Sequence, residues 1–103
     1  MKSQLSLIEN LKIIKVIQVQ DYYQLLFEKN FSMNILNDYM VKEVNSIEDL
    51  KNLRVTSTEN NERLVKINFE NNISLTVDLN DNAYHGPEAI VLYGPNNKIV
   101  VWN

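Results

Sequence analysis

The 103-residue chain contains no cysteine, which excludes a disulfide scaffold, a thiolate zinc site and a cysteine nucleophile. It also has only two glycines and two prolines. Two glycines are too few to build the phosphate-binding loops of nucleotide-dependent enzymes. Most turns must therefore be made by asparagine and aspartate, which tolerate the left-handed backbone conformation.

Basic residues are fewer than acidic ones: the chain has ten lysines and arginines and thirteen aspartates and glutamates, which gives a net charge of −3. The basic stripe of a nucleic-acid-binding protein is missing, so we expect no nucleic-acid partner. No apolar run approaches membrane-spanning length, and Glu9 and Asn10 interrupt the apolar stretch near the N-terminus before it could serve as a signal-peptide core. We expect a cytoplasmic protein without a membrane partner, which the lack of cysteine also fits.

A length of 103 residues and a hydrophobic content of 45 % predict a single domain over residues 1–103. Comparison of the chain with itself reveals a repeat at an offset of 42 residues, which takes Phe27–Met33 onto Phe69–Leu75 without a gap. The matches include asparagine, glutamate and serine positions that hydrophobic patterning does not dictate. We therefore predict an internal duplication of residues 5–37 and 47–79, followed by a C-terminal hairpin over residues 84–103.

Each copy contains a hairpin whose loop length follows from the pattern of apolar residues. A three-residue loop pairs Phe27 with Phe31 and keeps the apolar residues of both strands on one face. A two-residue loop would mix polar and apolar residues on that face. The three-residue loop places Asn30 in its last position, where a left-handed residue is needed, and Asn72 takes this place in the second copy.

The expected fold is α+β and predominantly antiparallel β, with each copy forming a three-stranded meander. The spacing of apolar residues predicts short helices over residues 5–11 and 47–53. Ser46 and Asp49 resemble a capping box at the start of the second helix. One long helix over residues 5–29 is the rival interpretation, which the β-branched residues and the repeat disfavour. A sandwich, a barrel and a single curved sheet all remain compatible with the pattern.

The expected strands are rich in β-branched and aromatic residues and are bounded by polar turns. They cover residues 12–20, 22–27, 31–36, 54–58, 63–69, 73–79, 88–93 and 98–102. The expected core is the apolar face of these strands. Its members are Phe27, Phe31, Met33, Ile35, Phe69, Ile73, Leu75, Val77, Ile90, Leu92, Val100 and Trp102.

The only histidine, His85, precedes Glu88 in a turn-forming segment. These two side chains could form an acid–base pair, but no nucleophile or oxyanion donor accompanies them in the sequence. Asp78, Asp81 and His85 are close in the sequence, yet they lack the spacing of a calcium loop, and an Asn/Asp-rich turn explains them. We expect no enzyme, no catalytic residue, no cofactor and no metal ion.

Acidic residues gather in the connector between the copies and in the turn that follows it. Charge runs are usually solvated surface, which is the plainer interpretation. The functional interpretation is a docking surface for a basic partner. The predicted partner-binding residues are Asp38, Glu43, Glu48, Asp49, Glu59 and Glu62.

Two sets of short motifs carry a family resemblance. The first is the pair of hairpins Phe27–Phe31 and Phe69–Ile73, and the second is the tail, where Tyr84–Leu92 precedes Ile99–Trp102. Together they resemble small bacterial immunity-type proteins found near polymorphic toxins and contact-dependent growth inhibition systems. The chain departs from the family pattern where asparagines replace the expected turn glycines in both hairpins.

The resemblance implies an immunity protein that binds and neutralises a cognate toxin, such as a nuclease with a basic surface, by direct protein–protein contact. The alternative is a non-enzymatic structural β domain that self-associates as a homodimer, or joins a larger assembly, through an exposed edge strand. A third interpretation is an enzyme that uses His85 and Glu88. The motifs transfer no binding residue to this sequence.

Overall fold

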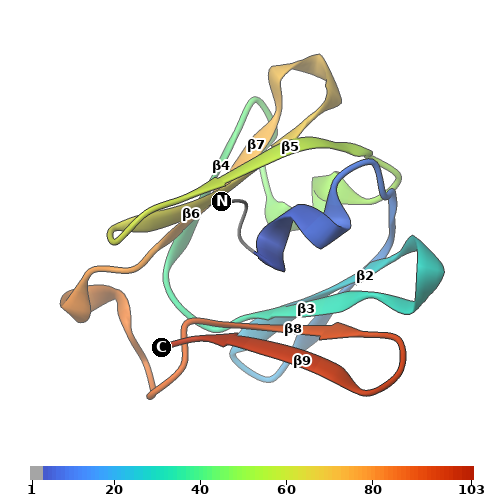
Figure 1. Ribbon diagram of the computed structural model, residues 1–103. Helices are drawn as coiled ribbons and strands as arrows, with labels where there is room; N and C mark the ends of the chain where they lie inside the picture. The colour runs from blue at the N-terminus through green and yellow to red at the C-terminus, as the bar shows by residue number, and fades with distance from the viewer. Residues whose placement is uncertain (1–3) are drawn as a thin grey trace.

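Nine strands form two facing antiparallel sheets in the computed structural model, which describes residues 4–103 (Figure 1). The predicted domain begins at residue 1, so its first three residues lie outside this description. One sheet has the order β1-β2-β3-β8-β9, with β1 (Ile13–Val19), β2 (Tyr22–Phe27), β3 (Ser32–Ile35), β8 (Ile90–Gly94) and β9 (Lys98–Trp102). The other has the order β4-β7-β6-β5, with β4 (Tyr39–Lys42), β5 (Val55–Asn60), β6 (Leu64–Phe69) and β7 (Ser74–Asp78).

Five short 3-10 turns, and no α-helix, accompany the strands within residues 4–103. The turns are η1 (Gln4–Ile8), η2 (Glu28–Asn30), η3 (Ile47–Leu50), η4 (Glu70–Asn72) and η5 (Asp81–Ala83). The predicted helices over residues 5–11 and 47–53 are therefore wrong, and the fold is β-rich rather than α+β.

The predicted helices fail because each segment holds only a short 3-10 turn; Leu11 and Leu53, the third apolar residue of each spacing, also pack on the core but lie outside the turns. In a 3-10 turn, residues three positions apart lie on the same side. Leu5 and Ile8 of η1 are therefore buried together, and so are Ile47 and Leu50 of η3. Asn10 and Asn52 then adopt left-handed conformations (φ 70° and 72°) and end the helical path. A segment this short cannot offset the cost of nucleating an α-helix.

All eight predicted strands are present, with boundaries within two residues of those predicted. The ninth strand, β4, lies in the segment that the sequence assigned to the acidic connector. It has only four residues and pairs with β7 alone, so its own pattern was too short to identify it.

The pairing registers of residues 5–37 (unit 1) and residues 47–79 (unit 2) recur at the 42-residue offset. Leu25 pairs with Met33 in unit 1, and Ile67 pairs with Leu75 in unit 2. The first strand pair of each unit also carries a bulge at the corresponding place. The two units are structurally equivalent, while their origin by duplication stays a prediction.

The three-residue hairpin loops are confirmed. The N–H of Phe27 donates to the carbonyl of Phe31 (2.8 Å), and Asn30 is left-handed with a φ of 64°. Lys29 is left-handed as well (φ 62°), which the sequence did not predict. Unit 2 repeats this geometry with asparagine in both left-handed positions.

The units meet in a short antiparallel contact between residues 10–13 and 52–55, which we name the junction. Four backbone hydrogen bonds of 2.8–2.9 Å join these segments, and each has a counterpart in which the donor and acceptor units are exchanged. Lys12 and Arg54 lie opposite each other at the centre of the junction. An approximate two-fold axis therefore relates the two units.

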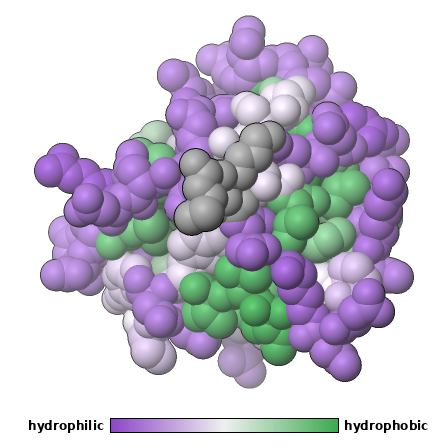
Figure 2. Space-filling view, viewed as in Figure 1, coloured by the Kyte–Doolittle hydropathy of each residue, from purple (hydrophilic) through white to green (hydrophobic). Residues whose placement is uncertain are grey.

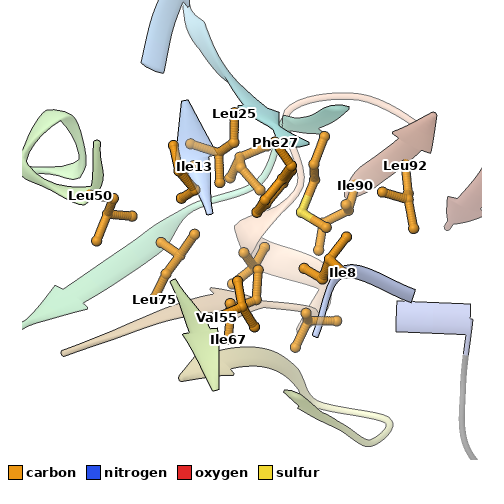
Figure 3. Close-up of a cluster of buried hydrophobic side chains, with 14 of the residues drawn as sticks. Ile8, Ile13, Leu25, Phe27, Leu50, Val55, Ile67, Leu75, Ile90 and Leu92 are labelled. Carbon is orange, nitrogen blue, oxygen red and sulfur yellow. The ribbon is translucent and has the colours of Figure 1, made fainter. Parts of the chain in front are cut away.

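The core fills the space between the sheets, and Figure 3 shows side chains from both sheets converging there. Eight of the twelve predicted core residues are buried. The other four are half-buried at the margin: Phe31, Ile73, Val100 and Trp102. The prediction omitted the turns, although Ile8 of η1 and Leu50 of η3 are fully buried (Figure 3).

Phe69→Ala tests this packing, because the Phe69 side chain is buried between the sheets. Truncation should lower the free energy of unfolding by about 3–5 kcal/mol, as is usual for a buried aromatic residue. Urea unfolding followed by fluorescence measures the change, with Tyr93→Ala on the outer surface as control. An unchanged midpoint for Phe69→Ala would contradict the core assignment.

At the junction, the carboxylate of Glu28 accepts a hydrogen bond from the N–H of Lys12 (2.9 Å) and one from the guanidinium of Arg54 (3.3 Å). The bond from Lys12 is the main reason that the pKa of Glu28 lies below its usual value of 4.5, and Arg54 lowers it further against a partial desolvation. A lowered pKa in the folded state stabilises the fold above the unfolded pKa, and this contribution is lost as pH falls through the folded pKa.

Glu28→Gln should therefore be less stable than the wild type at neutral pH. The difference should shrink as pH falls below 4.5, the usual pKa of glutamate, because the wild-type carboxylate is then protonated as well. Urea midpoints measured from neutral to acidic pH test this. A difference that stays constant over that range would count against the proposed ionic contribution.

Candidate functional site

Two links cross between the sheets at one end of the molecule (Figure 1). Residues 36–38 carry the chain from β3 to β4, and residues 79–89 carry it back from β7 to β8. The N–H groups of Leu36 and Asn37 donate to the carbonyl of Ala89 (2.9 and 3.2 Å), so the links lie side by side. This crossing brings together residues that are far apart in the sequence.

Asn37 is the buried polar residue at the crossing, with an exposed fraction of 3 %. Its amide nitrogen donates to the carbonyl of Asp78 (2.8 Å), which fixes the end of β7 against the link from β3. Its amide oxygen is buried and has no hydrogen-bond partner among residues 4–103. Leu79 occupies the equivalent place in unit 2, so Asn37 is a feature of this crossing rather than of the repeat.

His85 reaches Asp38 across the crossing, with 2.6 Å between the imidazole Nε2 and the carboxylate Oδ1. Both side chains are well exposed, at 64 % and 60 %. Their separation of 47 positions in the sequence hid this pair from sequence reasoning, which paired His85 with Glu88 instead. His85 and Glu88 do line one hollow of about 350 Å³, together with Asp21 and Leu36.

The His85–Asp38 pair could orient an imidazole for proton transfer, but a catalytic site also needs a nucleophile or oxyanion donors in reach. Among residues 4–103, neither side chain has a hydrogen bond to a serine, threonine or tyrosine hydroxyl. Within residues 4–103, no group of three or more histidine, aspartate or glutamate side chains could hold a metal ion, so Asp78, Asp81 and His85 do not form one.

A hollow of about 530 Å³ lies on the outer side of the four-stranded sheet, beside its edge strand β4; we name it the β4 hollow. Met40, which is 70 % exposed, and Leu64 supply apolar surface, and Asp38 and Asp78 supply carboxylates. The complete lining is Asp38, Tyr39, Met40, Arg63, Leu64, Thr76, Asp78 and Asn80. The hollow thus combines apolar surface with two carboxylates and the guanidinium of Arg63, so its charged groups are mainly but not wholly acidic.

Tyr39 of β4 contacts the other sheet next to this hollow. Its ring meets Tyr23 of the other sheet edge to face, with centroids 6.0 Å apart and planes at 81°. Partial burial raises the pKa of the Tyr39 hydroxyl, and the neighbouring Tyr23 and Glu48 raise it further. The hydroxyl therefore stays protonated at neutral pH and can donate a hydrogen bond.

The six predicted partner-binding residues do not gather on one surface. Asp38 and Glu43 flank the two ends of β4, and Glu48 lies near Tyr39. Asp49 is engaged locally, because its carboxylate accepts from the N–H groups that precede η3. The remaining two belong to the opposite side of the sheet, in β5 and in the turn after it: Glu59 and Glu62.

Sequence reasoning missed most of the β4 hollow, because its lining comes from three separate segments of the chain. Only Asp38 was among the predicted binding residues. If residues 39–42 had been recognised as a strand, the alternation of side chains would have placed Met40 on its outer face as exposed apolar surface.

No protein-family profile, curated protein or solved structure matches the chain. Within residues 4–103, no helix is long and apolar enough to cross a membrane. The assignment of a function must therefore rest on the geometry of the surfaces and on the sequence motifs.

Proposed function

We propose that this protein is a non-enzymatic, cytoplasmic immunity protein that neutralises a basic cognate toxin by direct contact through the β4 side of the four-stranded sheet. The observation that carries the proposal is the β4 edge itself. It combines exposed Met40, the carboxylates of Asp38 and Glu43 at its two ends, and the adjoining β4 hollow. The immunity-type motifs of the hairpins and the tail supply the toxin as the kind of partner.

The two kinds of surface have different roles in binding. Desolvation of the apolar surface around Met40 and Leu64 gives affinity. The carboxylates attract a basic toxin over longer distances and fix its orientation, which raises the association rate and lowers it again at high salt. A nuclease has a basic surface where it contacts nucleic acid, and an acidic partner can cover that surface.

Co-expression with the product of the adjacent gene tests the proposal. Wild-type protein should protect cells from that product and should co-purify with it at low salt. The double variant Asp38→Lys/Glu43→Lys should weaken binding at least roughly tenfold and lose protection, because it reverses both charges at β4. The double variant Glu59→Lys/Glu62→Lys makes the same charge change at the opposite edge and should still protect. The proposal fails if no neighbouring product is toxic, or if a toxic neighbour kills despite the wild-type protein.

A second candidate function, self-association, is favoured by the outer face of the five-stranded sheet. Ile17 and Leu26 of unit 1 lie on that face, whereas the equivalent positions of unit 2 hold Glu59 and Asn68. The fold therefore does not require apolar residues there. Ile99 of β9 continues this face and is 59 % exposed. Figure 2 shows an apolar area over the β8–β9 hairpin at the lower edge of the molecule.

Charge complementarity points to a second copy of this chain as the occupant of that face. Lys15, Lys29 and Lys98 lie at one end of the sheet, and Asp21 and Glu88 lie at the other end. Two copies packed face to face, with a two-fold axis across the strands, would set each basic end against the acidic end of its partner.

Light scattering after size exclusion tests self-association. The wild type should be a dimer whose dissociation increases at high salt, and Ile99→Lys should be a folded monomer. Thr76→Lys places the same charge on the outer face of the other sheet and should leave the dimer intact. A monomeric wild type at its highest soluble concentration would rule out this second function.

A further inference from the structure

The strand β4 is one edge of the four-stranded sheet, and no strand lies beyond it within residues 4–103. The carbonyl of Asp38 accepts from the N–H of Asp78 (3.0 Å), so the peptide groups of Asp38 are directed toward β7. Neighbouring residues of an antiparallel strand direct their peptide groups to opposite sides. The N–H and C=O groups of Tyr39 and Val41 therefore point to the open side of β4, where they can pair with a further strand.

The side chains of β4 alternate between the two faces of the sheet. Tyr39 and Val41 face inward, since Tyr39 contacts the other sheet and Val41 packs against the core. Met40 and Lys42 face outward and are exposed. Asp38 lines the β4 hollow together with Met40, so it lies on the outer face as well. The outer face of this edge thus carries an acidic, an apolar and a basic side chain in that order.

This order makes residues 38–42 complementary to themselves. Met40 is the central residue, with Asp38 two positions before it and Lys42 two positions after it. When two such segments run antiparallel about Met40, Asp38 of each copy lies opposite Lys42 of the other, and Tyr39 lies opposite Val41. Opposite charges, and apolar side chains that lie directly across from each other, are favourable cross-strand pairs.

We propose that β4 pairs with β4 of a second copy of this chain, antiparallel and with a two-fold axis at Met40, so that the two four-stranded sheets join edge to edge. The charge complementarity of residues 38–42 identifies the second copy as the occupant of this edge. The pairing goes beyond the proposed function and does not depend on it. It is also separate from the contact between the outer faces of two five-stranded sheets.

The direction of the peptide groups limits the register of this pairing. Residues that hydrogen-bond across the new contact must all direct their peptide groups to the open side, as Tyr39 and Val41 do. A register with Tyr39 opposite Tyr39, or Val41 opposite Val41, sets Met40 against a charged residue and leaves the other residue of each pair without a partner in β4. The register with Met40 opposite Met40 uses the peptide groups of both residues and satisfies both charge pairs.

Asp38 can take part although it already contacts His85. The contact joins the imidazole Nε2 to the carboxylate Oδ1, and the Asp38 side chain is still 60 % exposed. An ionised carboxylate accepts several hydrogen bonds, so Lys42 of the second copy can share it with His85. Lys42 has no ion pair of its own in the described part of the chain. Glu43 does not enter the pairing, because it is left-handed (φ 70°) and lies outside β4.

The contact is small, because each copy contributes only residues 38–42, whereas a stable interface has about 20–30 residues a side. We therefore expect the copies to pair in concentrated protein and to separate on the dilution of a sizing column. Pairing covers Met40, whose side chain is 70 % exposed in the single chain. It also blocks a sheet edge that would otherwise be open to unspecific strand pairing.

The concentration dependence of the NMR spectrum tests the pairing in the intact protein. The amide signals of Tyr39 and Val41 should shift in a saturable way as the protein is concentrated, because their N–H groups enter hydrogen bonds. Ile99→Lys, which should remove the contact between the five-stranded sheets, should show the same shifts. A wild type without these shifts, or their loss in Ile99→Lys, would overturn the proposal.

Two charge variants test the occupant and the register together. Asp38→Lys and Lys42→Asp should each pair at least roughly tenfold more weakly than the wild type, because both symmetric charge pairs become repulsive. A mixture of the two variants should pair as the wild type does, since each lysine of one then lies opposite an aspartate of the other. Glu59→Lys makes the same charge change at the opposite edge of the sheet and should pair normally by itself.

A retained melting transition verifies that each variant folds. Single variants that pair as strongly as the wild type would overturn the proposal. So would a mixture that stays unpaired, because the edge would then serve a strand of another protein.

Lys42→Asp also separates this inference from the proposed function. It keeps Met40 and the carboxylates that should attract the toxin, so it should protect cells although it no longer pairs. Protection by a wild type that does not pair would leave the immunity role standing and remove the pairing. Pairing by a protein that neutralises no neighbouring product would support the pairing and remove the immunity role.

Discussion

The junction between residues 10–13 and 52–55 is the contact on which the rest of the structure depends. Its four backbone hydrogen bonds join the edge strands β1 and β5 at one corner and hold the two units in a fixed relation. Because backbone bonds have strict geometry, they determine how the two sheets face each other more narrowly than apolar packing alone would. Arg54 adds a charged contact to Glu28, which ties unit 2 to the first hairpin of unit 1.

The two sheets are built on the same register but present different surfaces. The outer face of unit 1 carries the apolar residues Ile17 and Leu26 beside polar ones such as Gln24 and Asn34, and its sheet is extended by the β8–β9 hairpin. Unit 2 has polar residues at the places equivalent to Ile17 and Leu26, and its sheet ends at the short strand β4. The chain thus has one longer sheet with more apolar residues on its outside and one shorter sheet with an open edge at β4. Each suits a different kind of association.

Much of the fold could be predicted from the sequence because the same pattern of apolar and turn residues occurs twice in the repeat. The hairpin loops at Asn30 and Asn72 and the strand registers followed from the faces on which apolar residues must lie. The turns at η1 and η3 were predicted as helices because the i, i+3 spacing is common to both kinds of helix. The repeat could not reveal β4, whose place in the chain corresponds to η5 in the second unit.

The candidate site was largely beyond sequence reasoning. Asp38 meets His85 only because two links cross between the sheets, and no local pattern encodes that crossing. The acidic residues were predicted as one surface from their nearness in the chain. In the fold, Asp38 precedes β4 and Glu59 lies in β5, and the strands β7 and β6 separate β4 from β5. Charge clustering along a sequence locates a surface only when the intervening backbone keeps to one side of the sheet.

The chain order of β4 and β8 has a consequence for how the molecule folds. β4 follows unit 1 in the chain but completes the sheet of unit 2, and the β8–β9 hairpin follows unit 2 but completes the sheet of unit 1. Each three-stranded meander can form from local contacts. Neither sheet is complete, however, until strands that follow the other meander in the chain have paired with it. Because each half of the chain contributes strands to the sheet of the other half, we expect the two halves to unfold in one cooperative transition. The same arrangement, in which β4 connects the sheet of unit 1 to that of unit 2, holds β4 in position although it is only four residues long.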